Sequence, residues 1–398
     1  MGNLQFPLAR SLGSARRQSL TMPLGLYLHY PFCRNRCSYC DFYKELHDTK
    51  LQKQFFDALR TETDLIAGQC GKRRVRSIFI GGGTPSLMPV ELLEDWLAQV
   101  RDLFIVEDDF EFSVESNPES VSLELLQSWQ SLGVNRPLFG VQSFDPQLLK
   151  LLDRRHSPKD SHRAVYHANA LGFASFGLDL IFGLPGQNSD KLSADLEQFV
   201  DLAPPHISFY QLTIEDGTVL ADRVADGSIK LPDEELNLAM YRAGVQKMEE
   251  AGYRRYEVSS FAKPGFECRH NLGYWEGDEY LGLGPSAHSF IDGQRLFNYD
   301  NLHRYIETLD KGHLPQVVDE SGLDERMTEA IMLGLRTTQG ISRKRFVKRF
   351  GVSLRDRLDQ SHYRRLVESG HLLPDRGKLR LSDEGFYLVD EITRCLIK

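Results

Sequence analysis

The sequence predicts an α/β protein in which an incomplete, TIM-like (β/α)6 barrel is followed by a small C-terminal α+β domain of the winged-helix type. Between Leu24 and Leu212, short β-rich runs alternate with longer helix-like stretches. Their spacing, about 25 to 50 residues, is what right-handed βα crossovers need. Each run ends in a turn with distinctive glycine or polar residues, as expected at the functional face of such a barrel. Six units instead of eight leave the predicted barrel open at one side.

The predicted strands are rich in β-branched and aromatic residues and are bounded by glycine, proline and polar turns. They cover Leu24 to His29, Ser77 to Ile80, Glu111 to Glu115, Leu138 to Val141, Phe176 to Ile181 and His206 to Leu212. The turns that follow them read HYPFC, GGGTP, ESNP, GVQSF, FGLPGQ and QLTIE. Because parallel strands present their carboxyl ends on one face, we expect the side chains of these turns to gather there. The open side of the barrel should leave a cleft for a large ligand.

These patterns divide the chain into a disordered leader (1–22), the barrel (23–230), an extension (231–322) and the C-terminal domain (323–398). The extension should begin with a helix from Pro232 to Gly252, favoured by Asp233 near its start and by the glycine as its C-cap. We expect the extension to continue as an irregular, glycine-rich segment to about Asn298.

The C-terminal domain reads as helices around a hairpin that turns at Asp375 to Gly377, with Ser382 capping the final helix. Its segment RKRFVKRF interleaves basic and aromatic residues, a pattern compatible with nucleic-acid binding. The same pattern describes an amphipathic helix with Phe346, Val347 and Phe350 packed inward, and we favour this interpretation.

Composition and charge exclude several classes of protein. With 398 residues, of which 41% are hydrophobic and 26% charged, the chain can bury a large core, and we expect a soluble globular protein. Its net charge of -8 argues against nucleic acid as the main partner, because neutralising phosphates needs a surplus of Lys and Arg. No apolar run approaches the roughly 18 residues that span a bilayer. Any membrane contact should therefore be peripheral.

Residues 1 to 22 contain Arg10, Arg16 and Arg17 and no acidic residue, which faintly resembles an organellar transit peptide. Met22 directly precedes the first predicted strand, so a disordered extension or an upstream start is the simpler interpretation. We expect a cytoplasmic protein, with organellar targeting as the minor alternative.

Three of the six cysteines, Cys33, Cys37 and Cys40, form a CxxxCxxC pattern directly after the first predicted strand. Cysteines this few and this clustered indicate a reducing compartment, not a disulfide scaffold. Three thiolates on one loop suit a metal, but structural zinc takes four protein ligands and no Cys or His pair at zinc-finger spacing completes the set. A cubane iron–sulfur cluster fits better, because three thiolates leave its fourth iron open to a cofactor. Three unligated thiols in a turn are the alternative.

The surrounding residues resemble a known family. The stretch YLHYPFCRNRCSYCDFY is similar to the cluster loop of radical-SAM proteins, and its Tyr-x-His-x-Pro-Phe-Cys lead-in is typical of the HemN/HemW branch. The similarity continues through GGGTPS, ESNPES, GVNRPLFGVQSF and GLDLIFGLPGQ to the C-terminal tail. It implies a radical-SAM barrel with a [4Fe–4S] cluster on Cys33, Cys37 and Cys40, and S-adenosylmethionine chelated to the open iron.

The resemblance also implies which residues contact S-adenosylmethionine. They are Tyr27, Tyr39, Gly82, Gly83, Thr84, Glu115, Gln142, Arg154 and Asp179. From the residues alone, the glycine turn lets a ligand lie against backbone amides, whereas Glu115, Gln142 and Asp179 are polar groups among apolar strand residues and need partners. Each of these three could instead be a buried polar residue that serves the barrel. One departure from the family is Asp153, next to Arg154, where relatives tend to have glycine.

The segment HNLGYW, which begins at His270, matches the HNxxYW signature of HemW-like members. A histidine beside aromatic rings could supply an axial imidazole and flat apolar walls for a porphyrin. His270 is therefore our candidate haem ligand, with Cys268 and His288 as weaker candidates. A histidine held in place by ordinary hydrogen bonds is the alternative.

The resemblance implies one of two functions. Oxidases of the HemN type usually have a fourth cysteine two residues after the third, where this chain has Phe42. Phe42 and HNLGYW favour a haem chaperone, with haem as cargo and respiratory haem proteins at the membrane as acceptors. Oxygen-independent oxidation of coproporphyrinogen III, or another radical-SAM reaction, is the alternative, so the sequence leaves open whether the chain is an enzyme.

Overall fold

The computed structural model describes residues 23–374 and 376–398. The expected leader over residues 1–22 lies outside the described residues, as does Asp375 in the expected C-terminal turn.

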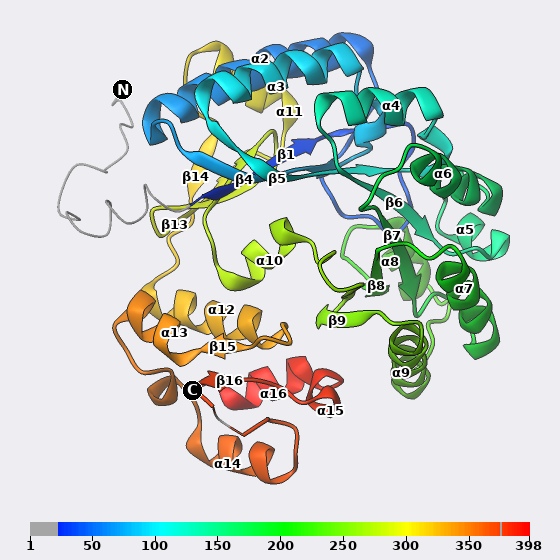
Figure 1. Ribbon diagram of the computed structural model, residues 1–398, viewed down its shortest axis with the longest axis vertical. Coiled ribbons are helices and arrows are strands. Elements are labelled where there is room, and N and C mark those ends of the chain that lie inside the picture. The colour runs from blue at the N-terminus through cyan, green and yellow to red at the C-terminus, as the bar shows by residue number, and fades with distance from the viewer. Residues whose placement is uncertain (1–22, 375) are drawn as a thin grey trace.

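A mixed β-sheet forms the centre of the molecule (Figure 1). Six parallel strands follow one another across it in chain order: β1 (Leu24–Tyr30), β4 (Arg74–Gly82), β5 (Ile105–Ser116), β6 (Arg136–Gln142), β7 (Gly177–Phe182) and β8 (His206–Gln211). These are the strands predicted from the sequence, and helices connect them as right-handed crossovers require. The α/β fold class is confirmed.

Further strands extend both ends of this parallel array instead of closing it. β1 pairs outward with the parallel strand β11 (Tyr280–Leu283), and β8 pairs outward with the antiparallel strand β10 (Ser260–Ala262). Across the described residues the strand order is β14-β13-β12-β11-β1-β4-β5-β6-β7-β8-β10-β9, so β1 and β8 are not neighbours. The barrel is therefore open. A separate parallel pair, β2 (Phe32–Cys33) and β3 (Glu45–Leu46), follows β1.

Helices cover the sheet and bury one apolar face each. In chain order they are α2 (Thr49–Cys70), α3 (Val90–Leu103), α4 (Leu123–Leu132), α5 (Pro146–Leu151), α6 (Pro158–Ala170), α7 (Ser189–Asp201), α8 (Val219–Ala225) and α9 (Glu234–Glu250). In α3, for example, Leu93, Trp96, Leu97 and Val100 recur at the helical period and are buried. Burial of each such side chain contributes about 1.5–3 kcal/mol. Within the two described ranges, no helix combines the length and apolarity needed to cross a bilayer.

The extension is more regular than the sequence predicts. α9 matches the expected helix, and the side chain of Asp233 caps it by accepting a hydrogen bond from the amide of Leu236. The segment expected to be irregular contains β9 (Arg254–Glu257), β10, α10 (Arg269–Glu276), β11, β12 (His288–Ile291) and β13 (Gln294–Asn298), and α11 (Leu302–Asp310) and β14 (Gln316–Val318) follow.

The expectation of an irregular segment was wrong because its glycines do not all mark loops. Some of them allow neighbouring strands to pack closely. A Cβ atom on Gly282 would lie 2.0 Å from the carbonyl oxygen of His288, so only glycine lets β11 approach the start of β12.

The C-terminal domain has a core of its own. It comprises α12 (Leu323–Leu335), β15 (Ile341–Ser342), α13 (Arg343–Phe350), α14 (Gln360–Glu368), β16 (Lys378–Leu379), α15 (Asp383–Phe386) and α16 (Val389–Leu396). β15 and β16 form a small antiparallel wing. Ser382 caps a helix as predicted, but the expected final helix is divided into the short α15, which Ser382 caps, and α16. In Figure 1 this domain lies beyond α10, which contacts both β4 and α12.

The packing of α13 differs from its prediction at one residue. Phe346 is buried and Phe350 is half-buried, but the side chain of Val347 is 45% exposed. Each residue advances the helix by about 100°, so Val347 points to the side of the face that Phe346 and Phe350 share.

Candidate functional site

The three clustered cysteines lie on one loop directly beyond β1. Cys33 ends β2, and Cys37 and Cys40 follow before the chain returns through β3. The amide of Glu45 donates to the carbonyl of Pro31 at 2.7 Å and closes the base of the loop. All three cysteines are free of disulfide bonds.

The glycine turn after β4 packs against this loop. The amide of Gly83 donates to the carbonyl of Tyr30 at 2.7 Å, and that of Thr84 donates to Phe32 at 2.9 Å. A Cβ atom on Gly83 would lie 2.7 Å from the carbonyl oxygen of Phe32. Gly82 has φ of 101°, and a Cβ atom there would lie 2.8 Å from the ring of His29. Gly83 is therefore required by the close approach of two backbone segments, and Gly82 by its positive φ and by the ring of His29.

The thiols fit an iron–sulfur cluster better than a single metal ion. Among the described residues, no three His, Cys, Asp or Glu side chains converge on one metal position. A cubane needs no such convergence, because each thiolate binds a different iron. The hydroxyl of Thr84 also donates to the Sγ atom of Cys33 at 3.4 Å, the kind of hydrogen bond to sulfur that stabilises a bound cluster.

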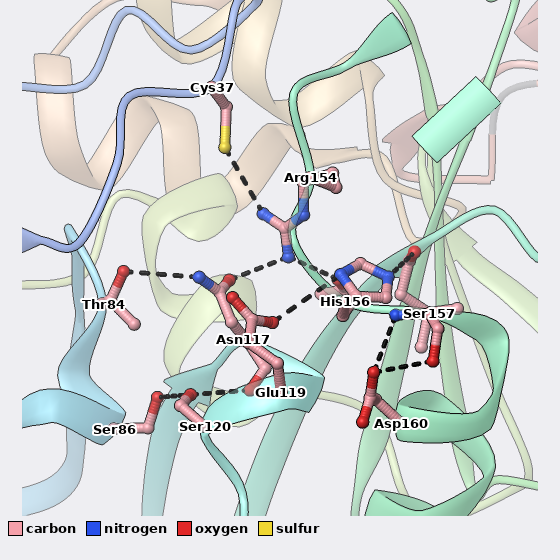
Figure 2. A network of polar contacts seen from close by, with 12 residues as sticks. Cys37, Thr84, Ser86, Asn117, Glu119, Ser120, Arg154, His156, Ser157 and Asp160 are labelled. Atoms are coloured by element: carbon pink, nitrogen blue, oxygen red, sulfur yellow. Dashed lines mark hydrogen bonds and ion pairs between the residues drawn. The ribbon is translucent and has the colours of Figure 1, made fainter. Parts of the chain in front are cut away.

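Arg154 joins the cysteine loop to the turn after β5 and to strand β6. Figure 2 shows its side chain between Cys37 and Asn117. One guanidinium nitrogen faces the Sγ atom of Cys37 at 3.9 Å, and the other donates to Asn117 Oδ1 at 2.8 Å and to the carbonyl of Gly140 at 2.7 Å. Asn117 in turn donates to the hydroxyl of Thr84 at 3.4 Å. A partly buried cation therefore stands beside the thiols, where it would offset the negative charge of thiolates and of a bound cluster.

Two carboxyl groups, Glu115 on β5 and Asp179 on β7, line the same small cavity. Burial raises the pKa of Glu115 from 4.5 to about 8, and repulsion by Asp179 adds to the rise. Burial likewise raises the pKa of Asp179 to about 6, against the hydrogen bond from Ser208 and the positive charge of Arg154. Both carboxyl groups line a cavity of about 150 Å³. A positively charged ligand at this place would favour their ionised forms.

The remaining predicted cofactor residues lie on the same face. Tyr27 points from β1 and shares a hydrogen bond of 3.2 Å with His29, and its pKa is raised by burial and by Glu115. The pKa of Tyr39 is raised by burial, with Arg154 opposing the rise. Gln142 ends β6 with φ of 65°, and its buried Oε1 atom has no hydrogen-bond partner among the described residues.

A second, larger pocket of about 940 Å³ opens beside this face. Its walls come from α10, the β12–β13 hairpin and helices α12 and α13 of the C-terminal domain, with Trp275 and Phe290 among the aromatic residues. Tyr27, Tyr210 and Tyr274 line both this pocket and the smaller cavity. The two spaces therefore adjoin across a wall of tyrosines.

Comparisons with known proteins identify the family. The model of the radical SAM superfamily matches residues 27–199, and that of the HemN C-terminal domain matches residues 323–388. The chain is 36% identical to the heme chaperone HemW of Bacillus subtilis, over 92% of this chain and 97% of that protein. The chain belongs to the HemW family of radical-SAM proteins.

Two further comparisons support the family and the fold, respectively. The heme chaperone HemW of Mycobacterium tuberculosis strain CDC 1551 / Oshkosh is 37% identical over 94% of this chain and 95% of its own length. The coproporphyrinogen III oxidase HemN of Escherichia coli superposes with a TM-score of 0.83 over 96% of this chain and 91% of that one, at 24% identity. At that identity, the HemN structure supports the fold alone.

The HemW signature residue His270 is held inside the protein. Its Nδ1 atom shares a hydrogen bond of 2.9 Å with Ser77, and its Nε2 atom shares one of 2.7 Å with the hydroxyl of Tyr274. The ring stacks on Phe79 at 5.2 Å, and burial lowers the pKa of His270 to about 3. His270 could ligate a haem iron only if one of these two hydrogen bonds broke, because each ring nitrogen already has a partner. Of the weaker candidates, Cys268 is buried and His288 is exposed to the large pocket.

Sequence reasoning missed two residues that organise this HemW site. Asn117 links Arg154 to Thr84, and its place in the ESNP turn could have indicated it. Glu111 lies in the middle of β5, where its carboxylate accepts hydrogen bonds of 2.9 Å from the amides of Arg269 and His270. It thereby caps the N-terminus of α10. Nothing in the local sequence indicates this contact, because it joins residues far apart in the chain.

Proposed function

We propose that this chain is a haem chaperone that binds haem, carries a [4Fe–4S] cluster and S-adenosylmethionine, and passes haem to respiratory haem proteins. It acts in the cytoplasm or at the surface of the inner membrane. The observation that carries the proposal is the large pocket between α10, the β12–β13 hairpin and the C-terminal domain. Curated relatives named heme chaperone HemW, matched over nearly their full length, support it.

The size and lining of the pocket suit a porphyrin. Its volume of about 940 Å³ lies near the upper end of the range, about 300–1,000 Å³, found for sites of small molecules and cofactors. Aromatic side chains such as Trp275, Phe290 and Phe346 offer flat apolar contacts. Arginines on the same walls offer partners for the propionate carboxylates of haem.

Cys33, Cys37 and Cys40 would hold the cluster. The proposed contacts to S-adenosylmethionine are those implied by the resemblance: Tyr27, Tyr39, Gly82, Gly83, Thr84, Glu115, Gln142, Arg154 and Asp179. When bound, the cluster supplies one-electron chemistry and an open iron for the cofactor. The chain contributes a partly buried cation at Arg154 and the two carboxyl groups of Glu115 and Asp179, which favour a positively charged ligand.

Phe42 favours the chaperone over an oxidase of coproporphyrinogen III. It stands where those oxidases usually have a fourth cysteine, and its side chain is 62% exposed and lines the large pocket. An exposed aromatic ring at the edge of a pocket is available for apolar contact with a bound ligand.

Haem titration of the anaerobically reconstituted protein tests the proposal. The expected result is binding of one haem per chain, followed by absorption spectroscopy. A triple Cys33→Ala, Cys37→Ala, Cys40→Ala variant should lose its iron and sulfide, whereas Cys395→Ala, at an exposed cysteine, should keep them. Haem affinity no greater than that of an unrelated control protein would refute the proposal.

A further inference from the structure

The β12–β13 hairpin presents one face to the large pocket. His288 and Phe290 alternate along β12 and so lie on the same side, and Arg295 on β13 pairs with Phe290 across the hairpin. All three side chains line the pocket. The hairpin therefore contributes an imidazole, an aromatic ring and a guanidinium to one wall.

His288 differs from the other histidines of this region in having free ring nitrogens. His270 uses both nitrogens, toward Ser77 and Tyr274. His29, which also lines the pocket, shares its nitrogens with Tyr27 and the carbonyl of Tyr43. No hydrogen bond joins the ring of His288 to any residue in the described part of the chain, and its nearest ring contact is Phe297 at 5.7 Å.

Helix α13 also lines the pocket, through Arg345, Phe346, Arg349 and Phe350. Arg345 pairs with Glu276 at 2.7 Å and with Asp278. Arg349, one turn further along the same face, has no ion pair or hydrogen bond to another described residue. Its guanidinium lies 5.2 Å from the ring centroid of Phe290 and 5.0 Å from that of Phe350. Contact with Phe290 places it beside the strand that carries His288.

We propose that haem binds in the large pocket that this hairpin and α13 line, with His288 as a ligand of its iron and Arg349 as the partner of a propionate carboxylate. This inference rests on the proposed haem binding and assigns its residues. Iron needs a ring nitrogen that is not already hydrogen-bonded, and His288 provides one without rearrangement. A carboxylate needs a guanidinium without an ion pair, and Arg349 provides that. The proposal thereby assigns haem as the ligand of the basic and aromatic segment RKRFVKRF, which forms α13.

The ionisation of His288 agrees with this role. Burial and the nearby positive charge of Arg295 lower its pKa below 6.5, against the opposite effect of Asp319. The imidazole is therefore neutral at pH 7, the form in which it ligates iron.

Absorption and electron paramagnetic resonance spectra of the haem complex test the ligand. His288→Ala in the full-length protein should shift the Soret band and remove the signature of imidazole ligation, and added imidazole should restore it. His270→Ala, which removes a buried contact, should lower stability but keep the spectrum of the remaining complex. An unchanged spectrum of His288→Ala would overturn the assignment. If the wild type binds no haem, the proposed function itself fails.

Affinities for haem and for haem dimethyl ester test the carboxylate contact. Arg349→Gln should weaken haem binding about 10–100-fold, the loss of one charged hydrogen bond, and Arg349→Lys should recover part of it. The matched control is Lys348→Gln on the outer side of α13, which should change nothing. The ester lacks the carboxylates, so Arg349→Gln should not affect its binding. Equal haem affinities of Arg349→Gln and Lys348→Gln would overturn this contact.

Discussion

Arg154 lies 3.9 Å from the Sγ atom of Cys37 although the two residues are 117 positions apart in the chain. The side chain reaches the cysteine loop from the end of α5, and Asn117 and Gly140 hold it there. Burial alone would lower the pKa of Arg154, but Tyr39, Cys37 and Glu119 together raise it, so the guanidinium stays charged. The cysteine loop is therefore built next to a fixed positive charge.

Replacing this charge should weaken retention of the cluster. Outer partners of metal ligands typically contribute about 10–100-fold in affinity, so we expect Arg154→Gln to lose iron and sulfide to a chelator about 10–100-fold more readily than the wild type. Chelator titration followed by the cluster absorption measures this. The neighbouring Arg155 is exposed, and Arg155→Gln is the control. Equal retention by the two variants would show that Arg154 does not support the cluster.

Asp153 has φ of 55°, in the left-handed region that suits glycine. Its carbonyl accepts a hydrogen bond of 3.0 Å from Asn35, a contact that glycine keeps. We therefore expect Asp153→Gly to raise the free energy of unfolding by up to about 1 kcal/mol, measured by urea denaturation. Asp153→Ala retains the Cβ atom and should give no gain. Loss of stability in Asp153→Gly would mean that the carboxylate, not the backbone, decides this position.

A methyl group on Gly83 should displace the cysteine loop, because it would meet the backbone of Phe32 at 2.7 Å. We expect Gly83→Ala to cost about 1–3 kcal/mol of stability and to lower the iron content after reconstitution. Gly68 is the matched control, since it lies in α2 and a Cβ atom added there would have nothing within 4 Å. Gly68→Ala should stabilise by about 1 kcal/mol. Full iron content in Gly83→Ala would contradict the close packing of the two segments.

The stability of the cofactor-free protein should fall as the pH rises toward 8. Glu115 has its pKa raised from 4.5 to about 8 by burial and by Asp179, so between these values the folded state holds a proton that the unfolded state has lost. Its contribution is complete below pH 4.5 and disappears as the pH passes 8. The change is on the order of a few kcal/mol.

Glu115→Gln should remove this part of the pH dependence, measured as unfolding free energy from pH 5 to 9. Glu62 titrates in the same direction, because burial raises its pKa to about 7. The difference between wild type and variant therefore isolates Glu115. If the unfolding free energies of wild type and Glu115→Gln changed in parallel from pH 5 to 9, Glu115 would be ionised in the folded protein over this range.

The barrel could be predicted because its signals are local. Hydrophobic runs and glycine turns mark each strand, and the cysteine spacing marks the loop. β5 nevertheless begins at Ile105 instead of Glu111, since its first part is acidic and partly exposed and shows no buried alternation. The parallel pairing of β1 with β11 joins segments about 250 residues apart and has no local signal.

The site could be predicted in its residues but not in their contacts. The signature HNLGYW is visible in the sequence, yet the hydrogen bond that holds His270 comes from Ser77, 193 positions away. Within residues 23–374 and 376–398, the ring of His288 has no hydrogen bond and the guanidinium of Arg349 has no ion pair, and no local sequence pattern indicates either fact. Which of these side chains has a hydrogen-bond or ion-pair partner is decided only by the tertiary packing.

The most direct measurement is haem transfer from the anaerobically reconstituted, haem-loaded protein to an apo-cytochrome, run beside an assay for coproporphyrinogen III with the same preparation. We predict that the Soret band moves to the acceptor with S-adenosylmethionine present and that coproporphyrinogen III is recovered unchanged. Haem that stays on the chain, or conversion of coproporphyrinogen III to a decarboxylated product, would contradict a haem chaperone.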